Sequence, residues 1–470
     1  MTTLAVKNFS FAYDTGQRNI LNDISFSPVA GSFNLLIGPS GSGKSTLLKA
    51  MAGLMPKFGG IVTGGQILLD GQDIQPVAPF ERAKRVAMLF QNPDRQFAMR
   101  TAPEQIAFAL ENIQLPAEQI QDRVADVMTR LNLTAFAEQD LMTLSGGEKQ
   151  RVALATILAM DSDIILLDEP FANVDPQARQ ALLHDLQALQ QTQGKTIVIS
   201  DHDLSGYAEL VDNLYVLEAS TGTLQSASLT RLTNLAPVVP FTGHPNPAGD
   251  LGWRQLHVSV GERTLLTGTT FTVPSQQIGL ISGANGIGKS TLFKALTKQI
   301  AATGTITWAE QDARKIKAKA WAKRVALIFQ TATDQFVTMT VAEELALSQR
   351  QTAYPDFWTA ERVADAVAQL NLTGVMDHIV YQLSGGQQKK LQTLVMLIMG
   401  QPVLLLDEPL AGLDQDSVQA VMTLLQSTVH ATQQAILMIS HQRQGLADFI
   451  DYELVFAEQQ LRLVGGATHA

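Results

Sequence analysis

The sequence predicts an α/β protein built from two tandem copies of one domain, each with a mostly parallel sheet. Residues 38–45 read G-x-x-x-x-G-K-[ST], between an apolar strand pattern at 33–37 and a helix pattern at 46–52. The same motif recurs at 283–290, again between a strand pattern and a helix pattern. Strand and helix patterns alternate through both halves, which is typical of α/β domains with a largely parallel sheet.

Each copy of the motif predicts a phosphate-binding loop. Its glycines let successive backbone N–H groups face the phosphates, and the following helix adds partial positive charge. Lys44 and Lys289 are then placed to reach the β- and γ-phosphates, and Ser45 and Ser290 to ligate Mg²⁺. The predicted nucleotide-binding residues are Gly38, Pro39, Ser40, Gly41, Ser42, Gly43, Lys44, Ser45 and Thr46 in the first loop, and Gly283, Ala284, Asn285, Gly286, Ile287, Gly288, Lys289, Ser290 and Thr291 in the second.

Further motif residues recur at a constant spacing of 239 positions. The pairs are Gln91 and Gln330, Ser145 and Ser384, Asp168 and Asp407, Asp175 and Asp414, and His202 and His441. A period above 200 residues indicates a duplicated domain and not a solenoid of small units. Periodicity fades from about residue 220 to 250, where prolines and glycines accumulate, so we predict domains at 1–228 and 251–470 joined by a linker at 229–250.

The composition of the chain excludes several kinds of site and argues against some kinds of partner. The 470 residues carry a formal net charge of −10 and no cysteine. Nucleic acid is therefore not expected as a main partner, and disulfides and thiolate metal sites are excluded. The first residues lack the basic start and apolar core of a signal peptide. The longest uncharged apolar stretch, 391–406, is interrupted by Gly-Gln-Pro at 400–402, so we expect no membrane span.

Two strand patterns of the first half, at 4–13 and 85–90, each end near a candidate ligand. Residues 4–13 alternate like a half-exposed strand and end at Tyr13, which either stacks on a nucleobase or is an ordinary strand aromatic. Residues 85–90 form a second strand pattern that delivers Gln91. If that strand lies beside the phosphate loop, Gln91 reaches Mg²⁺ or the attacking water. Its recurrence as Gln330 favours this role over that of a surface residue.

A helix with two glycines in its first turn follows. Ser145 is its predicted N-cap and Glu148 the capping-box partner. One interpretation is simply a well-capped helix. However, Gly146 and Gly147 weaken a helix by up to roughly 1 kcal/mol each compared with alanine. This cost is explained if the glycines allow an anion to approach the exposed N–H groups at the N-terminus of the helix, where its binding is favourable.

Acidic residues and a histidine complete the set. The buried-strand pattern at 164–167 ends in Asp168, suited to a Mg²⁺ contact, and Glu169, suited to polarise the attacking water. His202 follows the strand pattern at 196–200 and is placed to bond the γ-phosphate. Alternatively, the carboxylates are solvated loop residues and the histidine is a surface residue. The recurrence of all three in the second half, as Asp407, Glu408 and His441, favours the functional roles.

This ordered set resembles the ATP-binding cassette (ABC) ATPases twice, over essentially the whole chain, with Leu-Ser-Gly-Gly as its most specific element. The resemblance implies two P-loop NTPase domains of ABC type with an antiparallel N-terminal β part and a helical signature subdomain. It also implies a pseudo-dimer in which each ATP is held between the phosphate loop of one half and the signature of the other. Glu169, His202, Glu408 and His441 are then catalytic. The implied Mg²⁺ ligands are Ser45, Gln91, Asp168, Ser290, Gln330 and Asp407. The implied signature contacts to ATP are Ser145, Gly146 and Gly147, and Ser384, Gly385 and Gly386.

The second half departs from the family pattern in places. Val260 stands where Tyr13 stands in the first half, and Lys390 replaces the Arg found at 151. Both candidate bases are intact. We therefore predict two hydrolysing sites with unequal affinity for nucleotide.

The segment after Gln91, Q-N-P-D-R-Q-F, and the helix pattern at 103–112 resemble those of the energy-coupling factor (ECF) importer ATPases, and 330–336 keeps a weaker version. The resemblance implies an ATPase motor in which Gln96, Phe97, Gln335 and Phe336 dock on a T-type integral membrane subunit. A membrane-embedded substrate-binding subunit would select a vitamin, vitamin precursor or transition metal, and this chain would sit peripherally at the cytoplasmic face of the membrane. Alternatives are a ribosome-associated ABC-F-type ATPase and a sugar-import ATPase. The short, nearly uncharged linker and the intact second phosphate loop favour the ECF interpretation.

Overall fold

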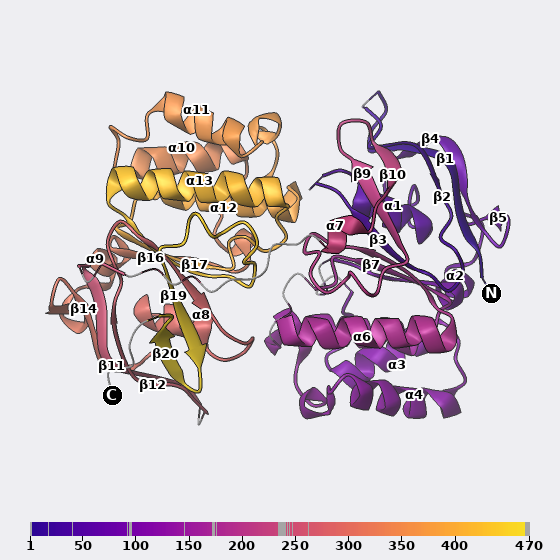
Figure 1. Ribbon diagram of the computed structural model, residues 1–470, viewed down its shortest axis with the longest axis horizontal. Helices are drawn as coiled ribbons and strands as arrows, with labels where there is room; N and C mark the ends of the chain where they lie inside the picture. Colours follow the sequence, from indigo (N-terminus) through magenta and orange to yellow (C-terminus); the bar gives the residue numbers. More distant parts are fainter. Residues whose placement is uncertain are drawn as a thin grey trace. The chain divides into compact units, whose positions relative to one another are not determined.

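The computed structural model describes residues 2–16, 18–39, 41–91, 93, 96–144, 146–171, 174, 176–233, 241, 243, 245–246, 248–261 and 263–465. Contacts within the chain divide it into two compact units, Met1–Leu235 and Ala236–Ala470. Both units repeat the same order of strands and helices (Figure 1). We call them the first and the second cassette.

Each cassette contains a four-stranded antiparallel sheet and a six-stranded sheet. In the first cassette the four-stranded order is β2-β1-β4-β5 and the six-stranded order is β10-β9-β3-β8-β7-β6. In the larger sheet the five strands from β9 to β6 are parallel, and only β10 is antiparallel. The strands are β1 Leu4–Ala12, β2 Leu21–Phe26, β3 Phe33–Ile37, β4 Ile61–Leu69, β5 Gln72–Asp73, β6 Val86–Leu89, β7 Ile164–Asp168, β8 Thr196–Ser200, β9 Asn213–Glu218 and β10 Thr223–Ala227.

The second cassette repeats this topology as β12-β11-β14-β15 and β16-β17-β18-β13-β19-β20. Its strands are β11 Leu251–Val260, β12 Arg263–Thr272, β13 Ile278–Ser282, β14 Thr303–Trp308, β15 Gln311–Asp312, β16 Val325–Ile328, β17 Val403–Asp407, β18 Ala435–Ile439, β19 Tyr452–Ala457 and β20 Gln460–Leu463. The predicted α/β class, with a parallel centre and an antiparallel N-terminal part, is confirmed.

Helices cover the larger sheets and form a separate layer before each signature segment. The helices are α1 Lys44–Met51, α2 Pro79–Arg85, α3 Ala102–Asn112, α4 Ala117–Arg130, α5 Gly146–Ala159, α6 Pro176–Gln193, α7 Thr230–Thr233, α8 Lys289–Leu296, α9 Ala318–Ala322, α10 Val341–Gln351, α11 Ala360–Gln369, α12 Gly385–Met399 and α13 Gln415–Thr432. Across the described part of the chain, none of these helices combines the length and the apolarity needed to cross a membrane.

Alternation along the buried strands separates two hydrophobic clusters on the two faces of the larger sheet. In β7, Ile164 and Leu166 pack towards α1 and the antiparallel sheet, whereas Ile165 and Leu167 pack towards the helical layer. Strands buried on both faces read as continuous apolar runs, as this one does. The sheet therefore holds β7 rigidly and delivers Asp168 at its carboxyl end.

The described parts of residues 220–250 are more regular than the loss of periodicity suggests. Residues 223–227 form β10, which pairs with β9 at the edge of the sheet, and Phe241 is buried in the core of the second cassette. The N–H of Asn246 donates to Gln277 Oε1 at 2.8 Å. An edge strand and a short docked segment carry too few apolar residues to show as a periodic pattern.

Candidate functional site

Each phosphate loop lies between a central strand and a helix, as predicted. The loops join β3 to α1 and β13 to α8. The Lys44 ammonium donates to the carbonyls of Gly38 and Pro39 at 2.7 and 3.1 Å. Lys289 makes the same bonds to Gly283 and Ala284, at 2.7 and 2.9 Å. Both lysines therefore lie inside the curl of their own loop, where a bound phosphate would meet them.

The first glycine of each loop is required by its surroundings. Gly38 and Gly283 have φ of 155° and 148°. A Cβ at Gly38 would lie 2.5 Å from the carbonyl oxygen of Leu217, and one at Gly283 would lie 2.4 Å from that of Phe456. In the first loop the Ser42 hydroxyl is buried without a hydrogen-bond partner among the described residues. A loop that leaves a polar atom unsatisfied fits an anion as its missing partner. Ser40 lies outside the described residues.

The predicted metal ligands Ser45 and Asp168 are in contact. Asp168 Oδ1 accepts from Ser45 Oγ at 3.0 Å and from Ser200 Oγ at 2.8 Å. Burial raises the pKa of Asp168, and the neighbouring Glu169 adds to this, while the two hydroxyl donors oppose the shift. In the second cassette burial raises the pKa of Asp407 and the nearby Ser290 hydroxyl opposes the shift, while Asp407 Oδ1 is buried without a hydrogen-bond partner among the described residues. Hydroxyl and carboxylate oxygens are hard ligands, so this donor set fits Mg²⁺.

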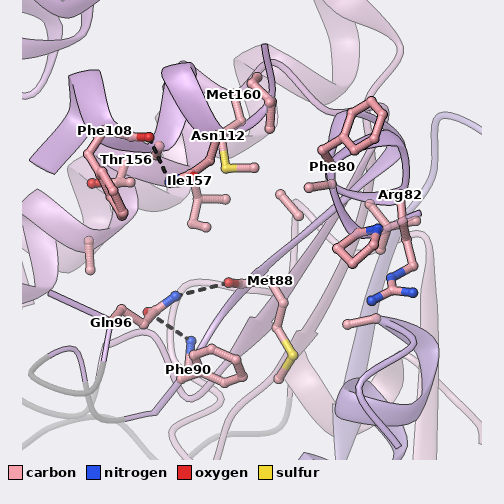
Figure 2. A pocket seen from close by; sticks show the side chains of 18 of the residues that line it. Phe80, Arg82, Met88, Phe90, Gln96, Phe108, Asn112, Thr156, Ile157 and Met160 are labelled. Atoms are coloured by element: carbon pink, nitrogen blue, oxygen red, sulfur yellow. Dashed lines mark hydrogen bonds between the residues drawn. The ribbon is translucent and has the colours of Figure 1, made fainter. Parts of the chain in front are cut away.

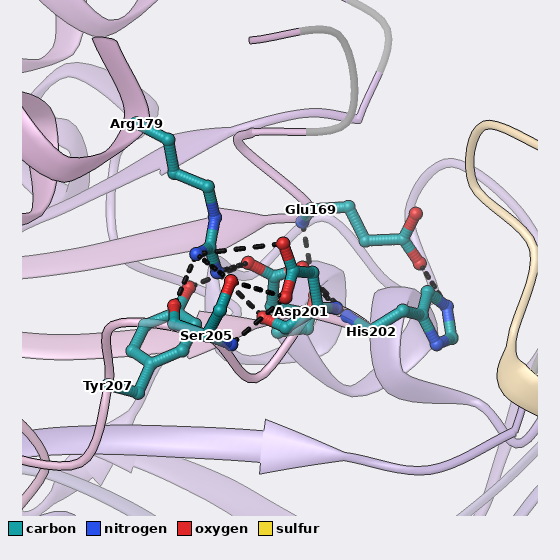
Figure 3. Close-up of polar contacts among 8 residues, drawn as sticks. Glu169, Arg179, Asp201, His202, Ser205 and Tyr207 are labelled. Carbon is teal, nitrogen blue, oxygen red and sulfur yellow. Dashed lines mark hydrogen bonds and ion pairs between the residues drawn. The ribbon is translucent and has the colours of Figure 1, made fainter. Parts of the chain in front are cut away.

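Glu169, at the end of β7, is held by two partners. Its Oε2 accepts from Gln91 Nε2 at 2.6 Å, and its Oε1 lies 2.8 Å from His202 Nε2 (Figure 3). Burial alone would raise the pKa of Glu169, but His202, Lys44 and Gln91 outweigh it and lower the pKa. The backbone of Glu169 has φ of 47°, a strained conformation typical of functional positions. The first cassette thus brings three predicted site residues together.

Glu408 has the same strained backbone, with φ of 49°, but looser contacts. His441 Nε2 lies 3.4 Å from its Oε1. Burial and the adjacent Asp407 raise the pKa of Glu408 to about 8, against the opposing charges of Lys289 and Lys389. Lys389 is itself buried, which lowers its pKa to about 8, and its ammonium donates to the carbonyl of Gln330.

Tyr13 lies beside the first phosphate loop. Its hydroxyl is 2.8 Å from Thr46 Oγ1, and the residue is 41% exposed. Val260, at the corresponding end of β11, is 56% exposed. The structure therefore places an aromatic side chain beside the first phosphate loop, while stacking on a base stays a prediction.

The signature of the second cassette starts α12 with the expected cap. Ser384 and Gln387 form a reciprocal capping box, with bonds of 3.0 and 3.3 Å. A Cβ at Gly385 would meet nothing within 4 Å. Packing within the described structure thus leaves this glycine replaceable, and closer approach by a ligand would explain it. In the first cassette α5 begins with Gly146 and Gly147, whereas Ser145 and Asp175 lie outside the described residues.

A cavity of about 670 Å³ opens on the first cassette between the end of β6 and the helical layer (Figure 2). Its apolar lining includes Phe80, Phe90, Phe97 and Phe108. Gln96 lies at its floor and bonds the N–H of Phe90 and the carbonyl of Met88, each at 3.1 Å. We call this cavity the groove.

The structure gives some of the predicted docking residues a different role. The Gln96 amide satisfies the open edge of β6, and Gln335 does the same for β16 by accepting from the N–H of Phe329 at 3.1 Å. Phe336 is only 8% exposed, in the core of the second cassette, so the prediction that it docks on a partner is wrong. Its apolar side chain belongs to the same hydrophobic cluster as residues of α12, which sequence pattern alone does not reveal.

Sequence reasoning also missed residues near the site. Ser200 bonds Asp168, yet its counterpart is Ile439, and Lys389 stands where the first cassette has Gln150. Aligning the halves at the 239-residue spacing shows both differences. What they touch is visible only in the structure.

Comparisons with known proteins agree with the repeated architecture. The profile of the family described as "ABC transporter" matches residues 21–172 and 266–411. The "Putative HMP/thiamine import ATP-binding protein YkoD" of Bacillus subtilis is 31% identical over 98% of this chain and 91% of its own length. A "Putative ABC transporter ATP-binding protein" of Streptococcus mutans is 30% identical over 97% of this chain and 89% of its own.

Among solved structures, "RNase-L Inhibitor" is similar with a TM-score of 0.65 and 22% identity, over 96% of this chain and 87% of that one. The "Model of ribosome-bound archaeal Pelota and ABCE1" gives 0.71 and 20%, over 97% and 78%. At these identities the likeness shows the fold alone. Because the family profile matches twice, on both cassettes that carry the phosphate loops, this chain belongs to the ABC transporter family as an ATPase with two ABC domains in one polypeptide.

Proposed function

We propose that this chain is the ATP-hydrolysing motor subunit of an ECF-type importer, which couples hydrolysis to uptake of a vitamin, vitamin precursor or transition metal through separate membrane subunits. The groove carries this proposal, because it offers an apolar seat whose lining includes Phe90, the residue before Gln91, and Gln91 bonds the candidate base Glu169. The names of two relatives support it, since one is called an HMP/thiamine import ATP-binding protein and the other an ABC transporter ATP-binding protein.

The proposed chemistry is positioning and electrostatic stabilisation. Ser45, Gln91 and Asp168, and their counterparts Ser290, Gln330 and Asp407, would hold Mg²⁺, which neutralises phosphate charge when bound. The loop N–H groups and Lys44 bind the phosphates. Glu169 polarises the attacking water, and His202, 2.8 Å away, holds that carboxylate in place. The second cassette uses Lys289, Glu408 and His441 in the same roles.

The contacts around the groove suggest how a membrane subunit would act on hydrolysis. Phe90 lines the groove and is bonded to Gln96, and the next residue, Gln91, donates to Glu169 at 2.6 Å. A helix of the membrane subunit pressed onto Phe90 would shift Gln91 relative to the carboxylate. An apolar groove receiving an amphipathic helix is a common recognition mode.

The prediction that each ATP is completed by the signature of the other cassette stays part of this proposal. The open surroundings of Gly385 support it, since no described neighbour requires a glycine there. The helix N-termini at Gly146 and Gly385 offer the N–H groups that an anion needs.

The test is to purify the tagged chain from its own cells in mild detergent and identify by mass spectrometry what comes with it. We expect a polytopic membrane protein in stoichiometric yield, together with a small membrane protein of the substrate-binding kind, and a location at the cytoplasmic face of the membrane. Phe108→Asp, in the groove, should lose the partner and keep ATP binding. Val29→Asp, at an exposed residue outside the groove lining, is the matched control. Ribosomal proteins without a membrane partner would overturn the proposal in favour of a ribosome-associated ATPase.

A further inference from the structure

The segment that carries His441 is fastened by an ion pair between a partly buried arginine and a buried carboxylate. Two residues after His441, Arg443 reaches Glu453 in β19, with Nη1–Oε1 at 2.6 Å and Nη2–Oε2 at 2.7 Å. This is a bidentate pair, the strongest geometry for arginine and carboxylate. Glu453 is only 1% exposed, although it sits in a central region of the sheet where apolar residues are usual.

The same carboxylate joins two further segments. Ser282, the last residue of β13 and the neighbour of Gly283 in the phosphate loop, donates to Glu453 Oε1 at 2.6 Å. The N–H of Phe241 donates to Oε2 at 3.2 Å, and the Phe241 ring lies 4.8 Å from the guanidinium carbon of Arg443. Burial would raise the pKa of Glu453, but its hydrogen bonds with Arg443, Ser282 and Phe241 outweigh this and lower it. The phosphate-loop strand, the His441 segment and the interdomain linker therefore meet at one ionised side chain.

The first cassette lacks these charges at the matching positions. At the offsets that align the two cassettes, the counterparts of Arg443, Glu453 and Ser282 are Leu204, Leu214 and Ile37. Leu214 is 2% exposed and packs in the core. An apolar side chain is thus compatible with this place in the fold, and stability alone does not call for an ion pair.

The first cassette instead fastens its histidine segment through α6 (Figure 3). Asp201, which precedes His202, accepts from Arg179 Nη2 at 3.1 Å, from Tyr207 Oη at 2.7 Å and from the N–H of His202 at 2.7 Å. Arg179 and Asp201 are both 7% exposed. The second cassette has Val418, Ser440 and Leu446 in place of Arg179, Asp201 and Tyr207. Each cassette therefore has an arginine–carboxylate pair next to its histidine, fully buried in the first cassette and partly buried in the second, and the two pairs are built from different elements.

We propose that Arg443 and Glu453 are positioning residues of the second nucleotide site, which hold the His441 segment against the strand that enters the phosphate loop, as Arg179 and Asp201 hold the His202 segment of the first. This inference rests on the proposed roles of Glu408 and His441. Replacing a buried ion pair by apolar residues is often neutral for stability, so the function of the pair is geometric. A small misplacement of groups that orient water costs up to about a hundredfold in rate.

The test copies the first cassette into the second with Arg443→Leu combined with Glu453→Leu in the full chain. We expect kcat for ATP to fall about tenfold, while KM for ATP and the unfolding temperature stay close to those of the unmodified chain. Adding Val418→Arg, Ser440→Asp and Leu446→Tyr, which transplants the pair of the first cassette, should restore most of the lost kcat. A purely structural role would not produce this rescue. The matched control is Arg462→Leu with Glu458→Leu, an exposed pair in the same cassette, which should change nothing.

Two outcomes would overturn the inference and are distinguishable from failure of the proposed function. If Glu408→Gln lowers turnover but the double leucine variant keeps it, the pair does not position the site. If Glu408→Gln itself leaves turnover unchanged, the hydrolytic role of the second site fails and the inference fails with it. Should the double leucine variant not fold, Arg443→Lys serves instead, because lysine keeps the charge but cannot bind both carboxylate oxygens in the same way. It should lower kcat at unchanged KM, and normal kcat would refute the proposal.

Discussion

The two cassettes carry the same motifs in the same order, yet they surround the candidate catalytic carboxylate differently. Glu169 touches Gln91 and His202 and has a lowered pKa, whereas Glu408 lies 3.4 Å from His441 and has a pKa raised to about 8. Asp168 has a second hydroxyl partner in Ser200, a position occupied by Ile439 in the second cassette. Matching motifs therefore establish two sites of one kind, while their neighbours decide how alike the sites are.

The most direct test of whether the two sites are alike is to remove the candidate catalytic carboxylate of each cassette in turn. We expect both Glu169→Gln and Glu408→Gln to lower steady-state ATP turnover by about a hundredfold or more, because a positioned base contributes at least that much. Phosphate release under saturating ATP measures this. If one of the two variants keeps full turnover, the prediction of two hydrolysing sites is wrong.

A second test concerns the buried lysine of the second cassette. Lys389→Gln, which copies Gln150, removes the ammonium that donates to the carbonyls of Phe329 and Gln330. We expect the end of β16 to loosen, turnover to fall by about fivefold, and more Mg²⁺ to be needed for half-maximal turnover. A Mg²⁺ titration of ATPase activity gives both quantities. Gln150→Met is the control, since Gln150 Nε2 is buried without a hydrogen-bond partner among the described residues.

The smallest expected effect is on nucleotide affinity. Tyr13→Val, which copies Val260, should weaken ATP binding at the first site by about fivefold, the equivalent of about 1 kcal/mol for one aromatic contact. Titration with a fluorescent ATP analogue resolves two classes of site. Tyr13→Phe separates the ring from the hydroxyl that bonds Thr46, and it should bind nearly as well as the unmodified chain. Equal loss in both variants would assign the effect to the hydroxyl and argue against base stacking.

Most of the fold and much of the site could be predicted from the sequence, because both depend on short stretches of neighbouring residues with a recognisable pattern. The strand before each phosphate loop, the helix after it and the strands that end in Asp168 and Asp407 are continuous apolar runs next to sharp polar motifs. The 239-residue repeat then supports single residues such as Gln91 and His202 that would mean little alone.

The remaining contacts could not be predicted because they join residues that are far apart in sequence and carry no motif. Glu453 reads as a charged residue in a strand, and only the structure shows Ser282, 171 positions earlier, donating to it. Gln96 and Gln335 looked like surface residues in a docking segment, but their amides complete the edges of β6 and β16. Long-range hydrogen bonds of this kind depend on topology, which a linear pattern does not encode.

The burial of Phe241 shows that part of the predicted linker belongs to the second cassette. Its ring belongs to the core of the second cassette, and its N–H bonds the carboxylate that also contacts the phosphate-loop strand. Phe241 and Asn246 are thus both anchored to that cassette. Lengthening the chain after Phe241 would strain these bonds, whereas an insertion before it would leave them in place. In engineering terms, the place to split or extend this protein lies on the N-terminal side of Phe241, about ten residues before the first strand of the cassette that it serves.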